Sequence, residues 1–346
     1  MRAAPSIDVE VGEGPPADAD WDRLVERSGA PLFYRSEVLR AYWRFPLRTT
    51  LAMYFIRVWD RPTGRLRAAL PTFLLPADDP LGVCPAMLPG FRAADGPLLL
   101  SHLWHWYDTC LPADDLDAGV LEAVHRGLRG LAERTGAQAY GFMNMPAEGA
   151  LAGLLAETGT PVHPIDARYQ LDLRGMRSAD DYLARLRPRP RQEMRRHLRL
   201  MESLGYRLTV GPPEPADMAA AARLCQVTSA KHGNPGWYDP ERLTRFGTEL
   251  HRFVNLVTIR RGSDLAAASI SLLDGHRFHN WAAGTQRLDD LGFSPYQVML
   301  HATVQAAIDN GCTLLEGGRR NDAWKERLGL SRQLLLGCLV PAGRER

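Results

Sequence analysis

Residues 312–329 read Cys-Thr-Leu-Leu-Glu-Gly-Gly-Arg-Arg-Asn-Asp-Ala-Trp-Lys-Glu-Arg-Leu-Gly, and the rest of the chain is organised around this stretch. Its apolar start predicts a strand, the Gly317-Gly318 pair predicts a turn, and the polar residues that follow predict a short helix over 321–328. Such a turn gathers an acid, three cations and an indole in one place: Glu316, Arg319, Arg320, Trp324 and Lys325.

Lys325 stands out because lysine is rare in this chain. Of the 42 basic residues only Lys231 and Lys325 are lysines, and all others are arginines. Under such a bias, a lysine that remains is a candidate for a role that arginine cannot fill. It can act as a compact point charge or lose a proton when desolvated. The alternative is that Lys325 has remained a lysine by chance and has no special role.

The composition is that of an ordinary globular protein. The chain has 346 residues, 45% hydrophobic and 24% charged, with a net charge of +2. This length predicts two domains, and the charge gives no global attraction to nucleic acid or membrane. The five cysteines have no zinc-site or CxxC spacing, which favours free thiols. No signal peptide or membrane-spanning run is apparent, so we expect a soluble cytoplasmic protein.

The second half has a clear element order. Apolar periodicity and turn residues predict one strand, two helices, a three-stranded meander, a long helix, and then a strand, a short helix and a final strand. Before them, Ser178 starts a helix that breaks at Pro188 and Pro190, and a second helix begins at Arg191. The predicted elements are strand 206–210, helices 215–231 and 239–252, strands 253–261, 265–274 and 277–285, helix 295–310, strand 312–316, helix 321–328 and strand 333–340.

The first half repeats part of this order. Residues 1–20 are expected to form a loose tail, and a helix follows over 32–45. Alternating strands and helices then predict helices packed on a sheet. These elements are strands 51–59 and 66–75, helix 116–134, strand 138–145, helix 148–157 and strand 165–173.

This order resembles the GNAT acyltransferase fold, and the doubled arrangement resembles FemAB-type aminoacyltransferases and the related peptidoglycan biosynthesis/recognition acyltransferases. The likeness covers residues 180–332. It rests on an arginine-rich helix ending Leu204-Gly205, on Ala230-Lys231-His232-Gly233, on the acid-Gly-Gly turn at Glu316, on the pair Trp324-Lys325, and on the helix ending at Gly311. It implies an α/β (α+β mixed sheet) fold with two GNAT-like domains in tandem, 21–175 and 176–346, and a cleft between them.

Two features bear on the acyl donor. GNAT enzymes hold the CoA pyrophosphate with a Gly-rich turn before the long helix. Here the turn Gln286–Pro295 has one glycine, a bulky Phe293 and two aspartates, which disfavours CoA. Residues 185–207 contain eight arginines against two glutamates, and this favours aminoacyl-tRNA, with Arg195 and Arg196 as phosphate contacts. The alternative is a solvated face of an arginine-rich helix.

The predicted catalytic residues are Lys325 and Glu316. The resemblance places a lysine at the donor end, where a fixed cation offsets the charge that develops on the acyl oxygen. Glu316 follows an apolar strand and is a candidate general base for the acceptor amine, or a charge at a strand end. Trp324 would stack on the donor, and Arg319 and Arg320 would bind its phosphate or an acceptor carboxylate.

The predicted acceptor site collects aromatic and basic residues from three segments. The loop after helix 215–231 borders the acceptor in the GNAT fold, and His279 shares a strand face with Trp281. The sequence His102-Leu-Trp-His-Trp-Tyr-Asp108 has the ligand spacing of a metal site, but no second group of ligands follows it. Its aromatic residues are therefore assigned to the cleft between the two predicted domains, where an acceptor could stack. The acceptor residues are Lys231, His232, Trp237, Tyr238, His279, Trp106 and Tyr107.

The sequence thus predicts an N-acyltransferase that transfers an aminoacyl group from aminoacyl-tRNA to a small, soluble amine. An acyl-CoA donor and a non-catalytic binding module are the alternatives. No metal or redox cofactor and no membrane partner are expected. The chain has no P-loop, no GxSxG elbow and no dinucleotide-binding fingerprint, so kinase, hydrolase and dehydrogenase functions have no support.

Overall fold

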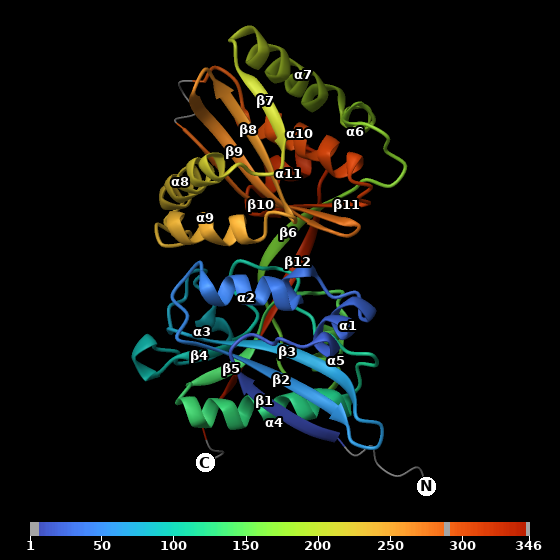
Figure 1. Ribbon diagram of the computed structural model, residues 1–346, viewed down its shortest axis with the longest axis vertical. Helices are drawn as coiled ribbons and strands as arrows, with labels where there is room; N and C mark the ends of the chain where they lie inside the picture. The colour runs from blue at the N-terminus through green and yellow to red at the C-terminus, as the bar shows by residue number, and fades with distance from the viewer. Residues whose placement is uncertain (1–6, 287–290, 344–346) are drawn as a thin grey trace. The chain divides into compact units, whose positions relative to one another are not determined.

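The computed structural model describes residues 7–286 and 291–343, and its contacts divide the chain into two compact units (Figure 1). Unit 1 runs to Asp166 and resumes at Leu334, and unit 2 is Ala167–Gln333. The described residues of each unit form a mixed sheet with helices, as the α/β prediction requires.

Unit 1 has the strand order β1-β2-β3-β4-β5-β12, in which β4 and β5 are parallel and the other pairs are antiparallel. Its main apolar cluster lies between the sheet and α4, with Val124 and Leu128 at its centre. The elements are β1 (Ile7–Glu13), α1 (Ala19–Arg27), η1 (Leu32–Tyr34), α2 (Ser36–Arg44), β2 (Ala52–Asp60), β3 (Arg65–Leu75), α3 (Cys84–Met87), η2 (Ala93–Asp95), β4 (Leu98–Ser101), α4 (Ala118–Thr135), β5 (Ala139–Pro146), α5 (Ala150–Glu157) and β12 (Ser331–Pro341).

Unit 2 has the order β6-β11-β10-β9-β8-β7, in which β10 and β11 are parallel. The element order predicted for residues 206–340 is confirmed. The elements are β6 (His163–Asp172), α6 (Ala179–Arg185), α7 (Pro188–Ser203), β7 (Arg207–Gly211), α8 (Pro215–Lys231), α9 (Pro240–Glu249), β8 (Val254–Arg261), β9 (Asp264–Asp274), β10 (Arg277–Thr285), α10 (Pro295–Asp309), β11 (Leu314–Arg319) and α11 (Asp322–Arg327).

The two sheets have the same plan, and each ends in a strand from the other half of the chain. In both, an antiparallel meander leads to one parallel pair, and a last antiparallel strand follows. In unit 2 that strand is β6, which pairs with β11, and in unit 1 it is β12, which pairs with β5. The compact units therefore differ from the predicted domains 21–175 and 176–346, because neither half completes its own sheet.

One local prediction is wrong, and another is confirmed with a shifted boundary. The expected loose tail contains β1, which pairs with β2 from Ile7↔Asp60 to Glu13↔Tyr54. Its alternate residues Ile7, Val9 and Val11 pack against the apolar cluster, which is the period-2 pattern of a half-buried strand. The predicted break lies between α6, which ends at Arg185, and α7, which begins at Pro188 and not at Arg191. Pro188 and Pro190 lie in the first turn of α7, where the N–H that proline lacks has no intrahelical partner.

Helices cover both faces of the unit 2 sheet (Figure 1). Phe278 and Leu315 pack with residues of α6 and α10 on one face. On the other face Trp281 packs against Phe246 of α9. Because side chains alternate along a strand, Glu316 and His279, the neighbours of Leu315 and Phe278, point to the face that carries α9.

The close approach of α8 to β10 depends on Gly284. A Cβ at this position would lie 2.2 Å from the carbonyl carbon of Leu224, a backbone atom of α8. We expect Gly284→Ala to lower the free energy of unfolding by about 3 kcal/mol, because backbone cannot yield as a side chain can. At Gly153 of α5 an added Cβ would meet no atom within 4 Å, so Gly153→Ala is the matched control. Equal melting temperatures for the two variants would contradict the prediction.

Candidate active site

The parallel strands β10 and β11 separate part-way along their length. They pair at only three positions, from Arg277↔Leu314 to His279↔Glu316, although β10 continues to Thr285. Beyond Glu316 the register between β11 and β6 also shifts, at Gly317-Gly318. Bulges of this kind redirect the side chains of a strand and are frequent next to active sites. The divergence begins beside Glu316 and His279, the last residues at which β10 and β11 pair.

Glu316 is a buried carboxylate with polar neighbours on β6. It is 0% exposed, and its Oε1 accepts a hydrogen bond from the side-chain amide of Gln170. The Nη1 of Arg168 lies 3.4 Å from the same oxygen. Burying a carboxylate is costly unless it is paired and hydrogen-bonded, and both conditions are met here. Glu316 is thus held in one orientation, as a proton-accepting group must be.

His279 adjoins Glu316 in the sheet and has a carboxylate partner of its own. Its Nε2 lies 3.3 Å from Oδ2 of Asp274, which also receives the guanidinium of Arg277 at 3.0 Å. Because Asp274 pairs with a cation and acts as acceptor, the His279 Nε2–H is the donor. The carboxylate fixes the imidazole ring, as an orienting partner does in many catalytic sites.

Aromatic residues of unit 2 lie on the same side. Tyr238 is buried, and its ring meets Trp281 edge-on at 6.0 Å and Trp237 at 6.4 Å. Burial raises the pKa of the Tyr238 hydroxyl well above its usual value, and the Cys225 thiol adds to this, while Trp237 and the guanidinium of Arg319 oppose it. The ring contacts bring together Trp237 and Tyr238 of the predicted site.

Lys325 and Glu316 lie on opposite faces of the sheet. The Lys325 ammonium donates to the carbonyl of Arg319 at 2.6 Å and lies 5.3 Å from the centroid of the Tyr169 ring. Tyr169 packs with the α6 and α10 cluster, whereas its neighbour Gln170 bonds Glu316. Trp324 packs against the Tyr169 side too. The prediction that one turn brings Glu316, Trp324 and Lys325 to the same site is therefore corrected. Glu316 lies on one face of the sheet, and Trp324 and Lys325 lie on the other.

The remaining cations of the predicted site are at the surface. Lys231 and His232 are exposed where α8 ends, and Arg195 and Arg196 are exposed on α7. Arg320 is exposed too, and its φ of 61° lies in the left-handed region. None of these five side chains lies within the buried network of Glu316 and His279.

Trp106 and Tyr107 belong to the core of unit 1. Trp106 is 0% exposed, stacks on Phe33 at 4.9 Å, and meets Tyr42 edge-on at 5.6 Å. An acceptor molecule could stack on this ring only if the core opened. We therefore assign Trp106 and Tyr107 to packing and not to an acceptor groove.

The start of α10, where GNAT enzymes hold pyrophosphate, is filled by protein groups. The backbone N–H of Ser294 donates to Nδ1 of His197 at 3.2 Å, and Phe293 packs edge-on against Tyr206. Burial lowers the pKa of His197, which keeps this ring neutral and able to accept the bond. The predicted turn also includes residues 287–290, which lie outside the described part of the chain.

Burial raises the pKa of three cysteine thiols of the chain. Burial raises the pKa of Cys225 to about 12 and of Cys312 and Cys338 to about 11, so these thiols stay protonated near neutral pH. Among the described residues no group of three or more histidine, cysteine, aspartate or glutamate side chains is placed to hold a metal ion.

The sequence reasoning missed three members of this network: Arg168, Gln170 and Asp274. A signal for two of them was present, because Arg168, Gln170 and Asp172 alternate with apolar residues along β6. Such a polar face is normally assigned to solvent, yet Arg168 is only 7% exposed. Asp274 ends the predicted strand 265–274, and its partners Arg277 and His279 lie on the next strand.

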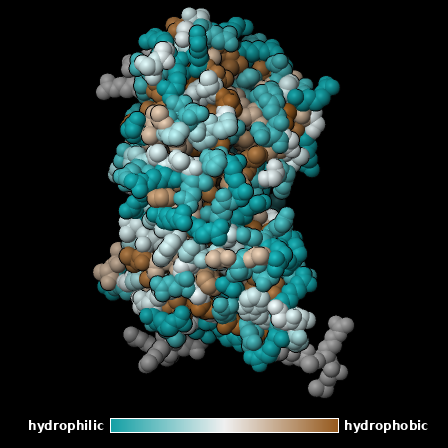
Figure 2. Space-filling view, in the orientation of Figure 1, coloured by the Kyte–Doolittle hydropathy of each residue, from teal (hydrophilic) through white to brown (hydrophobic). Residues whose placement is uncertain are grey.

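No helix in the described ranges is long and apolar enough to cross a membrane. Figure 2 shows hydrophilic residues over most of the visible face, with hydrophobic residues in small separate spots. Such scattered residues are normal on protein surfaces.

Comparisons with known proteins agree with this architecture. Residues 188–326 match the family described as an acetyltransferase (GNAT) domain. Among curated proteins, none matches the chain. A crystal structure of FemX is similar over 95% of this chain and 97% of its own, with a TM-score of 0.62 and 11% identity.

Two further structures share the fold. A tandem GNAT protein from the clavulanic acid biosynthesis pathway is similar over 98% of this chain and 100% of its own, with a TM-score of 0.56 and 14% identity. The C-terminal domain of a putative lysylphosphatidylglycerol synthetase from Agrobacterium fabrum covers 92% of this chain and 91% of its own, with a TM-score of 0.52 and 12% identity. Residues 188–326 therefore match the acetyltransferase (GNAT) domain family, and the whole chain has the tandem GNAT fold.

Proposed function

We propose that the protein is an N-acyltransferase that joins an aminoacyl group from aminoacyl-tRNA to the amine of a small molecule, with its reaction centre in unit 2. The observation that carries the proposal is the separation of β10 and β11 at His279 and Glu316, within the segment that matches the acetyltransferase domain. This separation starts beside the buried carboxylate of Glu316, which Gln170 and Arg168 hold in one orientation.

The chemistry needs a proton acceptor and a group that stabilises negative charge. The acceptor amine attacks the carbonyl carbon of the donor ester, a C–N bond forms, and the negative charge moves to the carbonyl oxygen. Glu316 takes the amine proton. The ester C–O bond then breaks as the adduct collapses, and the proton passes from Glu316 to the ribose oxygen, which leaves as a hydroxyl. Arg319, which pairs with Arg168 on the Glu316 side, is the proposed cation on the donor side. Lys325 bonds the Arg319 carbonyl from the other face of the sheet and is proposed to hold Arg319 in position.

The choice of donor rests on two regions of unit 2. The start of α10 has its Ser294 N–H bonded to His197 and its space occupied by Phe293, which leaves a poor cradle for pyrophosphate. Around α7, six exposed arginines make no ion pair with any described carboxylate, so they can bind a polyanion. These are Arg187, Arg189, Arg195, Arg196, Arg199 and Arg207.

The acceptor in this proposal is a soluble amine. One structure with the same fold comes from the clavulanic acid pathway, which builds a small molecule. Tyr238, Trp237 and His279 lie on the Glu316 face and are proposed to bind the acceptor. Lys231 and His232 are proposed to border it, at the loop after α8.

The donor test is a product assay with purified protein and a panel of amines, supplied with either a mixed aminoacyl-tRNA pool or acyl-CoA thioesters. We expect amide product only with the tRNA pool, and none after RNase treatment. Product from a CoA thioester in the presence of RNase would overturn the tRNA donor but not the acyltransferase. Absence of product with every donor would favour a binding module.

Salt dependence tests the α7 surface separately. The double variant Arg195→Gln/Arg196→Gln should weaken tRNA binding and lower the slope of log K against log salt by about 1 to 2, because each lost phosphate contact releases fewer counterions. The control is Arg126→Gln/Arg134→Gln on α4, which removes two equally exposed arginines from unit 1. Equal slopes for both double variants would show that α7 does not contact the donor.

A further inference from the structure

Two side chains of β6 converge on one oxygen of the Glu316 carboxyl group. Gln170 donates its side-chain amide to Oε1, and the Nη1 of Arg168 lies 3.4 Å from the same atom. Because Gln170 and Arg168 are two positions apart on one strand, they lie on the same face of the sheet and approach Glu316 together. The strand register agrees, since Gln170 is the direct partner of Glu316 between β6 and β11.

This geometry differs from that of a purely structural ion pair. A guanidinium that stabilises a carboxylate frequently takes both of its oxygens, in two parallel hydrogen bonds. Arg168 instead faces one oxygen, at a distance beyond the roughly 2.7–2.9 Å of a charge-assisted hydrogen bond. The hydrogen bond to this oxygen comes from Gln170, whose amide is neutral.

A neutral donor suits a carboxyl group that changes its protonation state. Ionised and protonated Glu316 both keep an acceptor at Oε1, provided that the proton goes to Oε2. Oε1 accepts the Gln170 amide and faces the cation of Arg168, and both contacts disfavour a proton on that atom. The amide therefore donates to Oε1 in both states, and the carboxyl group does not have to turn during the reaction.

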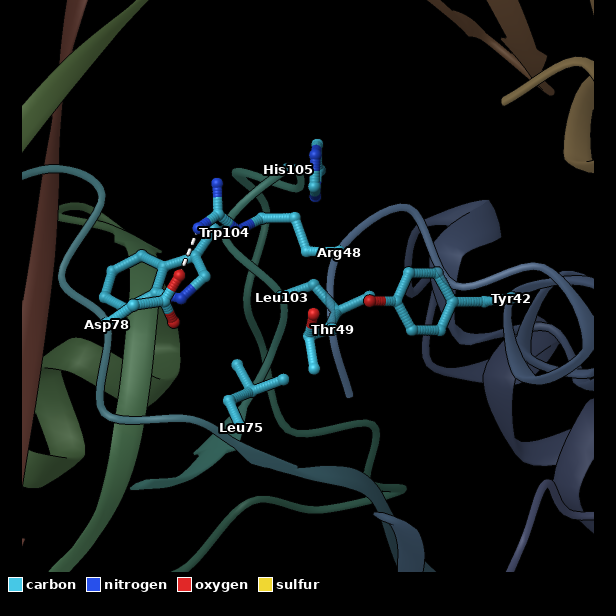
Figure 3. A pocket seen from close by; sticks show the side chains of 8 residues that line it. All are labelled: Tyr42, Arg48, Thr49, Leu75, Asp78, Leu103, Trp104 and His105. Atoms are coloured by element: carbon cyan, nitrogen blue, oxygen red, sulfur yellow. Dashed lines mark hydrogen bonds and ion pairs between the residues drawn. The ribbon is translucent and has the colours of Figure 1, made fainter. Parts of the chain in front are cut away.

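Burial makes Glu316 depend on this donor. Glu316 is 0% exposed, so protein groups must replace the water that an exposed carboxylate binds. Figure 3 shows a contrasting pair in unit 1, where Arg48 bonds Asp78 but the Asp78 side chain is 45% exposed and in contact with water. Loss of one protein donor costs little at such an exposed pair and much more at Glu316.

We propose that Gln170 is a positioning residue that holds the Glu316 carboxyl group in one orientation before and after it takes the amine proton. This inference rests on the proposed function, in which Glu316 is the base. Gln170 acts through Glu316 and does not touch the reacting atoms. Because its amide favours the ionised form of Glu316, removal of the amide raises the pKa of this carboxyl group, and the base is then available only at higher pH.

The kinetic test is Gln170→Met, which replaces the amide by a thioether of similar length that donates no hydrogen bond. We expect kcat for amide formation to fall about 10- to 100-fold, as loss of a hydrogen bond to a charged group implies. The KM for the amine should stay unchanged, because Gln170 does not bind it. The acidic limb of the pH profile of kcat should move upward by about one pH unit.

Gln138→Met is the matched control. Gln138 is half-buried like Gln170, and its side-chain amide donates to the carbonyl of Gly96 in unit 1 at 2.6 Å. Its replacement should lower the melting temperature and leave kcat and the acidic limb unchanged. If Gln170→Met does not fold, Gln170→Asn takes its place, because it withdraws the amide from Glu316 by one methylene, and the expected directions are the same.

A second measurement needs no turnover. Infrared difference spectra against Glu316→Gln isolate the carboxyl band of Glu316, and a pH titration of this band gives its midpoint. We expect a higher midpoint in Gln170→Met and the wild-type midpoint in Gln138→Met. An active Gln170→Met protein with wild-type kcat and midpoint would overturn the positioning role and leave the acyl transfer intact. A raised midpoint with no product from the wild type and any donor would overturn the proposed function, and the positioning role with it.

Discussion

Glu316→Gln is expected to lower kcat/KM about 100- to 10,000-fold, the range found when a general base is removed. Glutamine keeps an acceptor oxygen for Gln170 but cannot take a proton from the acceptor amine. The acidic limb of the pH profile of kcat/KM should disappear with it. The measurement is steady-state amide formation over a pH series, with circular dichroism of the same samples to check folding.

A purely structural role for Glu316 predicts a different pattern. Its carboxylate pairs with Arg168, and breaking a buried pair leaves an uncompensated charge that costs roughly 3–5 kcal/mol. The double variant Glu316→Gln/Arg168→Met removes both charges and should recover much of that stability. If activity returned together with stability, the base assignment would be wrong. If stability returned without activity, it would be supported.

The sequence predicted the elements of unit 2 because each carries its own periodic pattern. The meander 253–285 and the helix 295–310 needed no tertiary information, and the strand pairings followed from short turns. The missed strand β1 had such a pattern too, since Ile7, Val9 and Val11 alternate with acids. Its Pro- and Gly-rich surroundings suggested a tail. An alternating pattern over seven residues is a stronger indicator of a strand than the composition of the flanking residues is of a tail.

The two halves of the chain exchange a strand, since β6 pairs with β11 of unit 2 and β12 pairs with β5 of unit 1. This exchange could not be predicted by the same reasoning. Pairing of β6 with β11 joins residues about 145 positions apart, such as Gln170 and Glu316, and no local pattern encodes a partner at that distance. The candidate site depends on this exchange, because β6 supplies Arg168 and Gln170. Glu316 was predicted from its place after an apolar strand, whereas its partners required the sheet order.

The position of Lys325 shows a second limit of sequence reasoning. A Gly-Gly turn followed by a helix predicts that nearby side chains gather, but not on which face of the strand each one lies. The left-handed residues Arg320 and Asn321 turn the chain so that α11 packs on the Tyr169 side. Glu316 stays on the other face, beside His279. Backbone geometry at two non-glycine residues decided this, and the sequence carried no clear sign of it.

Lys325→Met is expected to lower the single-turnover rate of acyl transfer about 100-fold, because its ammonium holds the turn that presents Arg319 to the donor oxygen. Methionine has nearly the same length and remains compatible with a side chain that is 6% exposed. The same bond to the Arg319 carbonyl also has a structural task, since it closes the turn into α11. That task alone would lower the melting temperature and leave the rate per folded molecule unchanged.

The two roles of Lys325 are separated by measuring rate and stability on the same samples. Arg327→Met is the matched control, because it removes a cation from the same short helix whose partner is Glu193 on α7. We expect a small loss of stability and an unchanged rate for Arg327→Met. A Lys325→Met protein that melts earlier but turns over like the wild type would reduce Lys325 to a structural residue. Arg319 would then have to keep its position without the bond from Lys325.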